Sequence, residues 1–246
     1  MKKFIKSIIL TILSVVITVG TIVGGIGYMD YKDAIEETRL NEKVAEIQED
    51  ENYTTIEEMP KIYKDAVIAV EDKRFYTHKG IDPISLGRAI VNDIKAMSFV
   101  EGGSTITQQF AKNAYFTQDK ELTRKVAEAF MAIEIEKNFE KEEILELYLN
   151  TSYFGDGCYT VKEASRHYFD REPAEMTDYE ATLLAGVPNA PSVYAPTKSL
   201  DLAHQRQRQV LNKMVDSGYL TEGEAQKIEN EANEIEEVTK EKIENE

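Results

Sequence analysis

The sequence has no tryptophan and only one cysteine, three histidines and six prolines among its 246 residues. The single cysteine, Cys158, excludes an intramolecular disulfide framework and any metal site built from several cysteines. His78, His167 and His204 stand far apart, so a histidine-rich metal centre is not expected either. With 42% hydrophobic and 30% charged residues, the chain is nevertheless suited to a packed core.

Positive charge is also scarce, since the formal net charge is −16. Residues 1–59 carry 6 Lys and Arg against 11 Asp and Glu, and residues 221–246 carry 3 against 10. Residues 60–220 are nearly balanced, at 20 against 24. The total argues against nucleic-acid binding, while the balanced middle leaves room for a local basic pocket.

One long apolar run decides the expected compartment. Ser7–Met29 has no charged residue and follows three lysines. As a helix these residues span roughly 34 Å, which is enough for a hydrocarbon core of about 30 Å. The positive-inside rule then places residues 1–6 in the cytoplasm and the chain after Met29 outside. A cleaved signal peptide is the alternative, but its apolar region is normally shorter, about 7–15 residues. We therefore expect a single-pass anchor in the cell membrane at residues 7–29.

Two acidic flanks border the middle of the chain. Residues 30–57 are helix-favouring with few large apolar side chains, which predicts an acidic stalk rather than core. Residues 221–246 open with the capping-box pattern Thr221-x-x-Glu224 and continue as a glutamate-rich tail, for which a solvated helix or frayed terminus is expected. The catalytic domain is therefore expected at residues 58–220.

The signals in this middle region are nearly all helical. Starts are predicted near Pro60, Asp82-Pro83, Thr177 and Ser199, and a further helix at Lys141–Asn150. Another helix carries an apolar stripe on one face, formed by Leu122, Val126, Ala129, Phe130 and Ile133. No stretch alternates convincingly with a period of two, so the domain is predicted to be mainly α.

The first polar cluster, residues 71–80, lies where the first of these helices runs out. A carboxylate there feels the negative end of the helix dipole, which favours proton uptake. Such a group suits general-base removal of a proton from a sugar hydroxyl. The ordinary alternative is that Glu71 forms a surface ion pair with Arg74.

The second polar cluster, residues 101–113, follows the paired glycines Gly102-Gly103. Its hydroxyls, amides and ammonium group suit a substrate that carries sugar hydroxyls and phosphate oxygens. The alternative is a capped helix start with exposed polar residues.

In the third cluster, Lys120, Arg124 and Glu128 recur every four residues. This spacing fits an ordinary ion-pair ladder on a helix surface. The functional alternative is a cationic cluster that holds a diphosphate beside a second carboxylate.

Five ordered motifs resemble those of the peptidoglycan glycosyltransferases, glycosyltransferase family 51, in their monofunctional form. They are Glu71-Asp72-x-x-Phe75-x-x-His78-x-Gly80, Gly102-Gly103-Ser104-Thr105-Ile106-Thr107-Gln108-Gln109, Arg124-Lys125-x-x-Glu128, Lys141-x-x-Ile144-Leu145-Glu146-x-Tyr148-Leu149-Asn150, and Glu180–Pro191. Together they cover roughly residues 58–220.

The resemblance implies a lysozyme-like helical fold with a small membrane-proximal jaw subdomain. It also implies polymerisation of lipid II, an undecaprenyl-diphosphate-linked disaccharide-pentapeptide, into β-1,4 glycan strands for cell-wall synthesis and cell shape. Inversion and release of undecaprenyl diphosphate accompany that reaction. Expected partners are lipid II, the growing glycan and the bilayer. Cell-wall transpeptidases are also expected as partners, because no Ser-x-x-Lys motif of a penicillin-binding transpeptidase occurs.

Carried over residue by residue, the resemblance makes Glu71 the general base and Glu128 a second essential carboxylate on the diphosphate side. The residues expected to bind substrate are Ser104, Thr105, Gln108, Gln109, Lys112, Lys120, Arg124 and Lys125. Lys120 stands where many members carry arginine, so it keeps the charge without the planar fork. His78 and the fourth motif are expected to be structural. No cofactor is required, and Mg²⁺ or another divalent cation is expected only as an ion recruited with the diphosphate.

Two other functions are compatible with parts of this pattern. A membrane-anchored, lysozyme-like muramidase or lytic glycosidase also uses two carboxylates, although it has no reason to gather cations beside them. A non-catalytic cell-wall scaffold would tolerate the change Glu71→Gln.

Overall fold

The structure is a computed structural model that describes residues 2–96, 102–116 and 122–232. Its α-helices are α1 (Lys2–Glu37), α2 (Leu40–Gln48), α3 (Lys61–Glu71), α4 (Pro83–Ala96), α5 (Ile106–Tyr115), α6 (Leu122–Asn138), α7 (Lys141–Leu149), α8 (Val161–Phe169), α9 (Asp178–Gly186), α10 (Pro191–Tyr194) and α11 (Leu200–Asp216). Short 3₁₀ helices are η1 (Ile56–Glu58), η2 (Pro173–Glu175) and η3 (Val187–Asn189). The described residues contain no sheet, only an isolated bridge between Gly155 and Cys158. The predicted mainly α fold is confirmed.

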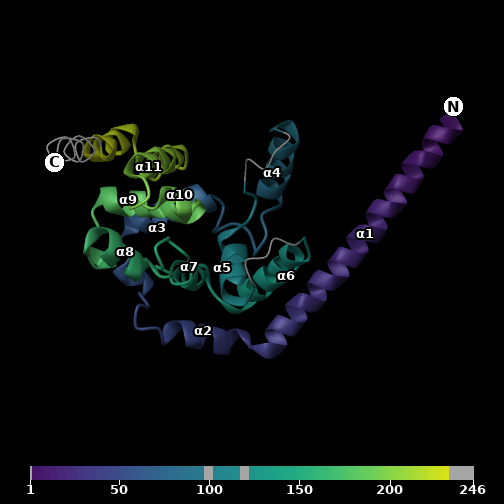
Figure 1. Ribbon diagram of the computed structural model, residues 1–246, viewed down its shortest axis with the longest axis horizontal. Coiled ribbons are helices and arrows are strands. Elements are labelled where there is room, and N and C mark those ends of the chain that lie inside the picture. The colour runs from purple at the N-terminus through teal and green to yellow at the C-terminus, as the bar shows by residue number, and fades with distance from the viewer. Residues whose placement is uncertain (1, 97–101, 117–121, 233–246) are drawn as a thin grey trace.

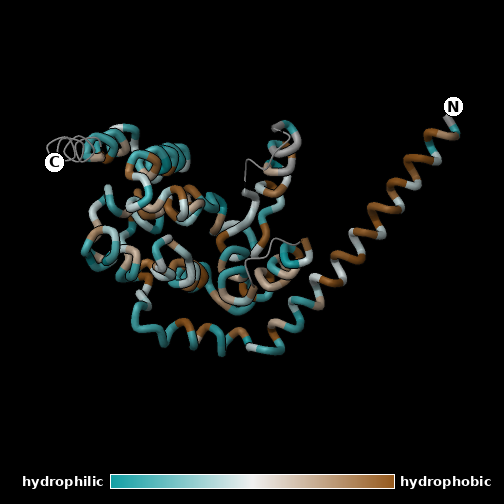
Figure 2. Tube along the Cα trace, viewed as in Figure 1, coloured by the Kyte–Doolittle hydropathy of each residue, from teal (hydrophilic) through white to brown (hydrophobic). Residues whose placement is uncertain are grey.

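α1 is the one helix among the described residues that is long and apolar enough to cross a membrane. Its apolar segment is exposed and projects well beyond the folded body (Figures 1 and 2). The helix does not stop where the apolar run ends. It continues through Glu37, and its last turns pack along α6.

The segment predicted to be an acidic stalk is instead attached to the core. Tyr31, Leu40 and Val44 are each only 7% exposed and belong to the main hydrophobic cluster. The stalk prediction is therefore wrong for these side chains. A few well-spaced apolar residues are enough to bury one face of a helix whose other face is charged.

The body of the domain is built from helices that pack in two connected groups. α3 packs against α9 and α11, and α5 packs against α6 and α7. Fully buried large side chains fill the centre, including Tyr63, Phe75, Phe110, Met131 and Tyr148. The arrangement brings the end of α3 next to α5, and α5 next to α6.

Two predicted helix starts show the capping chemistry that the sequence indicated. The Thr177 hydroxyl accepts a hydrogen bond from the Glu180 amide at the start of α9. The Ser199 hydroxyl accepts one from the Leu202 amide at the start of α11. Each hydroxyl satisfies an amide that has no partner within its helix.

The apolar stripe predicted on α6 lies on a different face from the one that enters the core. Leu122 is 76% exposed and Phe130 is 37% exposed, whereas Ala127, Met131 and Ile135 are fully buried. Phe130 instead contacts the aromatic rings of α1. The predicted helix is present, and it packs on two sides, against the core and against α1.

The start of the acidic tail also differs from the prediction. The capping box is present, since the Thr221 amide donates to Glu224 at 2.8 Å, and residues 222–232 are helical. Ile228 and Ala232 are buried in a cluster with α9 and α11 side chains, so this part is a packed helix and not a solvated one. The remainder, residues 233–246, lies outside the described part of the chain.

α4 stands away from the rest of the body and points to the same side as the free end of α1 (Figure 1). Ile84 and Leu86 on this helix are exposed. The place and apolar surface of α4 fit the small membrane-proximal subdomain that the resemblance implies.

Candidate active site

Glu71 is the last residue of α3, and its two carboxylate oxygens have different surroundings. Oε2 accepts a hydrogen bond from Nε2 of Gln109 at 2.8 Å. Oε1 is buried and forms no hydrogen bond with any residue that the structure describes. Nη2 of Arg206 on α11 lies 3.9 Å from Oε1. One oxygen is therefore held by a hydrogen bond, while the other has none among the described residues.

The alternative of a surface ion pair between Glu71 and Arg74 is wrong. Arg74 instead binds Asp82, with Nη2 2.6 Å from Oδ2, and donates to the Ser85 hydroxyl at 2.9 Å. Arg74 therefore fixes the entrance to α4 and leaves the carboxylate of Glu71 to α5 and α11.

Gln109 is fixed from its other side by Tyr148 of α7. The Tyr148 hydroxyl donates to Oε1 of Gln109 at 3.4 Å. Burial, reinforced by the charge of Glu71, raises the pKa of Tyr148 well above its ordinary value, so the hydroxyl keeps its proton. The amide of Gln109 consequently turns its NH₂ group toward Glu71.

Asp72 connects the end of α3 to the start of α5. Its Oδ2 accepts a hydrogen bond from the Ile106 amide at 3.0 Å and lies 2.7 Å from Nε2 of His78. Asp72 and the side chain of His78 are both buried. This arrangement agrees with the structural role expected for His78.

Two of the predicted substrate-binding residues, Thr105 and Gln108, are buried and engaged with the loop itself. The Thr105 hydroxyl donates to the Gly80 carbonyl at 2.6 Å and accepts from the Gln108 amide at 3.1 Å. Oε1 of Gln108 accepts from the Thr105 amide in return. These contacts favour a structural role for both side chains, as a capping box that shapes the start of α5.

The third motif forms a compact charge cluster on α6. Glu128 is fully buried; its Oε1 accepts from Nε of Arg124 at 3.0 Å, and its Oε2 accepts from Nζ of Lys125 at 2.5 Å. Lys125 also donates to the Ser104 hydroxyl at 2.7 Å, which joins the second motif to the third. The i, i+4 pair exists, but it is a buried carboxylate between two cations and not a surface ladder.

Lys112 of α5 interacts electrostatically with both carboxylates. Burial lowers the pKa of Lys112, while the charges of Glu128 and Glu71 raise it and those of Lys125 and Arg124 lower it. Its charge thus interacts with those of Glu71, Arg124, Lys125 and Glu128. α5 joins the Glu71 end to the Glu128 end.

Lys120, the remaining predicted phosphate ligand, lies outside the described residues. Conversely, sequence reasoning missed Arg206, which comes 135 positions after Glu71 in a helix read only for its apolar stripe. It also treated Tyr148 as core alone. Tyr148 is core, and in addition its hydroxyl orients Gln109.

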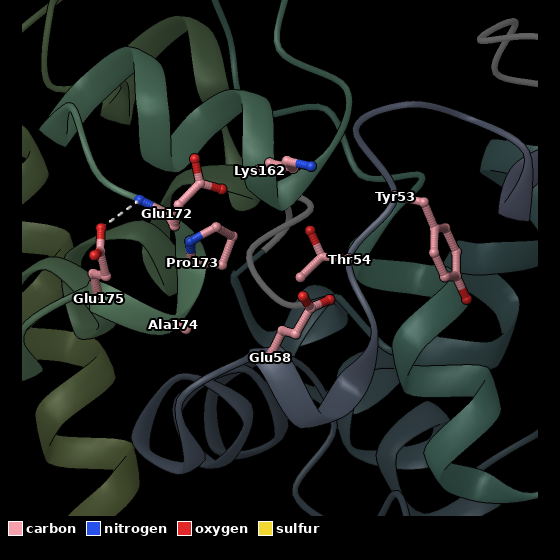
Figure 3. Close-up of a pocket in the computed structure, with 8 residues that line it drawn as sticks. All are labelled: Tyr53, Thr54, Glu58, Lys162, Glu172, Pro173, Ala174 and Glu175. Atoms are coloured by element: carbon pink, nitrogen blue, oxygen red, sulfur yellow. Dashed lines mark hydrogen bonds between the residues drawn. The ribbon is translucent and has the colours of Figure 1, made fainter.

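A pocket elsewhere on the molecule is separate from these residues (Figure 3). It measures about 280 Å³ and lies between the chain around Tyr53, the start of α8 and η2. Its carboxylates are already used: Glu58 caps η1 and Glu172 pairs with Arg166. None of the predicted site residues lines this pocket.

The described residues include no group of three acidic, histidine or cysteine side chains that could hold a metal ion. Glu128, the carboxylate expected near the diphosphate, already has a cation on each oxygen. The donor set therefore does not fit a resident metal, and no step below depends on one.

Comparison with known proteins gives consistent relatives. Residues 38–215 match the family model described as Transglycosylase. Penicillin-binding protein 1F of Bacillus subtilis (strain 168) is 48% identical over 171 residues, which are 70% of this chain and 24% of that protein. Penicillin-binding protein 1A of Aquifex aeolicus (strain VF5) is 44% identical over 169 residues, which are 69% of this chain and 23% of that protein. The chain thus spans about a quarter of the length of these curated relatives.

Among solved structures, the crystal structure of penicillin-binding protein 1A from Haemophilus influenzae is 29% identical and covers 50% of this chain and 15% of that chain. Its TM-score is 0.35, too low to establish a shared overall arrangement.

Proposed function

The chain belongs to the transglycosylase family, and from this premise we propose that it is a peptidoglycan glycosyltransferase that polymerises lipid II into β-1,4 glycan strands. One observation carries the proposal. α5 carries both Gln109, which binds the carboxylate of Glu71, and Lys112, whose charge interacts with Glu71 and with the cluster around Glu128. A proton acceptor and an anion-binding cluster on neighbouring helices are what transfer from a diphosphate-linked donor needs.

The acceptor half of the reaction uses Glu71. As the acceptor's 4-hydroxyl oxygen bonds to the donor's anomeric carbon, its proton passes to Oε1 of Glu71, the oxygen without a hydrogen-bond partner among the described residues. Gln109 binds Oε2, which orients the carboxylate and leaves Oε1 to accept the proton. Arg206 balances its charge from α11.

The donor half uses the cations. The bond from the anomeric carbon to the diphosphate breaks, and undecaprenyl diphosphate leaves with both electrons as a stable anion. Lys112, Arg124 and Lys125 compensate that charge, and we assign Lys120 to the same task. In-line attack inverts the anomeric centre, which converts an α-linked donor into a β-linked product.

The surroundings of Glu128 favour a transferase over a glycosidase. A glycosidase needs a carboxylic acid that protonates the leaving sugar. Both oxygens of Glu128 are engaged by Arg124 and Lys125, so neither is placed to carry and deliver a proton. We assign Glu128 the role of holding these cations in place toward the diphosphate.

The apolar helix α1 supplies the membrane anchor in this proposal. We place residues 1–6 in the cytoplasm and the catalytic domain outside, next to a donor that is itself held in the bilayer. Confining enzyme and donor to one surface reduces the entropic cost of their encounter. Since Leu40 and Val44 are buried in the main core, we extend the catalytic unit to include α2.

We keep as part of the proposal that a divalent cation arrives with the diphosphate. Polymerisation measured with magnesium and with a chelator tests this point separately from the assignment of Glu71.

The proposal is tested by incubating the full chain, in detergent or vesicles, with fluorescent lipid II. The expected products are glycan polymer and free undecaprenyl diphosphate in proportion to the bonds formed. Shortening of preformed glycan without polymer growth would establish the glycosidase instead. No reaction on either substrate would favour the scaffold.

A further inference from the structure

α1 packs closely against α6 at Gly27. A Cβ atom built on Gly27 would lie 2.5 Å from the Thr123 carbonyl oxygen and 2.6 Å from Cβ of Val126. Gly20, Gly24 and Gly25 on the same helix have nothing within 4 Å of such an atom. Any side chain at position 27 therefore forces the two helices apart, because a backbone atom is among those it meets.

This contact lies at the end of the apolar run. Gly27 precedes Met29, the last residue of that run, by two positions, which is about 3 Å along a helix. The turn of α6 that contains Thr123 and Val126 therefore lies level with the edge of the hydrocarbon core. Arg124 and Lys125 belong to that same turn of α6.

Aromatic side chains strengthen the packing just beyond Gly27. The ring centroids of Tyr28 and Phe130 are 5.2 Å apart, and those of Tyr31 and Phe130 are 6.0 Å apart. Tyrosine is enriched at membrane interfaces, so this cluster fits the same depth. The end of α1 and the first half of α6 are thus packed together by aromatic contacts as well as at Gly27.

We propose that Gly27 is a positioning residue that sets the depth of the diphosphate-binding cations in the bilayer. With no side chain at position 27, α6 seats directly on the membrane helix and presents Arg124 and Lys125 at the level of the donor's phosphates. The effect on depth depends only on α1 crossing the membrane, whereas the effect on catalysis rests on the proposed function.

The depth is measured with a fluorophore on α6. In a Cys158→Ala background, Leu122→Cys provides a single labelling site on an exposed residue at the start of α6. The full chain is reconstituted in phosphatidylethanolamine–phosphatidylglycerol vesicles that contain lipids spin-labelled at the headgroup or along the acyl chain. We expect Gly27→Val to reduce quenching about two-fold or more, while Gly24→Val and Gly25→Val match the parent.

Activity in the same vesicles gives the second readout. We expect kcat/KM with lipid II in the bilayer to fall about ten-fold or more in Gly27→Val. With a short-chain diphosphate donor in detergent, where depth has no meaning, the change should stay within about two-fold. An equal loss in both assays would indicate a damaged active site and would overturn the inference.

Thermal unfolding in detergent checks that each variant is folded. If Gly27→Val does not fold, Gly27→Ala is used, because its Cβ alone meets the Thr123 carbonyl. Unchanged quenching in a folded position-27 variant, or equal changes in the Gly24 and Gly25 variants, overturns the proposal. If the parent protein has no transferase activity, the proposed function fails while the quenching result still decides the depth.

Discussion

At the scale of single residues, Gln109 fixes the orientation of the Glu71 carboxylate, the proposed general base. It donates to one oxygen of Glu71 and accepts from the buried Tyr148 hydroxyl, so both ends of its amide are fixed. A carboxylate that rotates freely spends less time with its available oxygen toward the acceptor hydroxyl. Loss of this restraint should therefore lower the rate of the chemical step and leave the affinity for the donor unchanged.

We therefore predict that Gln109→Leu lowers kcat for polymerisation about 10- to 100-fold with little change in KM. Steady-state kinetics with lipid II measure both constants. The exposed Gln226→Leu serves as the matched control and should behave as wild type. A rise in KM at unchanged kcat in Gln109→Leu would contradict the assigned role.

The second residue-scale prediction concerns pH and Lys112. Burial lowers the pKa of Lys112 below the ordinary lysine value of 10.5, so its positive charge is lost at a lower pH than that of an exposed lysine. In the proposed function, Lys112 uses that charge to bind the donor's phosphates. We predict that KM for lipid II rises as pH increases through this lowered pKa, whereas below it KM is constant.

Lys112→Arg is the test, since a guanidinium keeps its charge over the whole range. Its KM should stay flat up to a higher pH than that of wild type. Superimposable pH profiles for the two proteins would show that Lys112 does not contact the donor's phosphates.

At the scale of elements, the junction of α3, α4 and α5 depends on Thr105. Its hydroxyl caps α5 and also donates to the Gly80 carbonyl. Thr105→Ala removes a cap worth about 1 kcal/mol and leaves the carbonyl without that donor, at a cost of about 1–3 kcal/mol. We predict a lower unfolding temperature together with lower activity, because α5 carries Gln109 and Lys112.

Thr177→Ala is the matched control for this prediction. Thr177 caps α9, an element without a site residue, and it is exposed. The Thr177→Ala variant should lose only the capping contribution to its free energy of unfolding, about 1 kcal/mol, and keep the kcat of wild type. Equal activities in the two variants, measured well below their unfolding temperatures, would remove Thr105 from the support of the site.

Local signals in the sequence predicted most of the elements and failed where a helix has more than one buried side. Thr177 and Ser199 allowed two helix starts to be predicted, because capping is a contact between residues close in the sequence. The apolar stripe predicted on α6 includes Phe130, which packs against α1, whereas the core is met by another face of the helix. The periodicity of apolar residues predicts that a helix has two apolar faces. It does not predict which partner each face packs against, because that depends on tertiary packing.

The same limit applies to the site. Glu71, Glu128 and the cations could be named because they stand in long ordered motifs, and the structure brings the described ones together around α5. Arg206 could not be named, since its approach to Glu71 depends on how α11 packs against α3. Thr105 and Gln108 were predicted to bind substrate because they belong to the second motif. Both are buried, so membership of a motif did not separate a substrate-binding role from a structural one.

At the scale of the whole molecule, the proposed orientation places residues 1–6 in the cytoplasm and the domain after α1 outside. We predict that protease added outside intact spheroplasts removes the chain after residue 37 while a tag at the N-terminus stays protected. The same digestion after lysis should remove the tag as well. A tag that is cleaved in intact spheroplasts would reverse the orientation.

The central claim is that Glu71 takes the proton of the acceptor hydroxyl. Its most direct test is polymerisation of labelled lipid II by wild type, by Glu71→Gln and by Glu57→Gln, an exposed control on η1. We predict that Glu71→Gln retains its fold and its affinity for the donor but loses at least about 100-fold in polymerisation rate, and that Glu57→Gln polymerises as wild type does. Glycan synthesis by folded Glu71→Gln at the rate of wild type would show that Glu71 is not the proton acceptor.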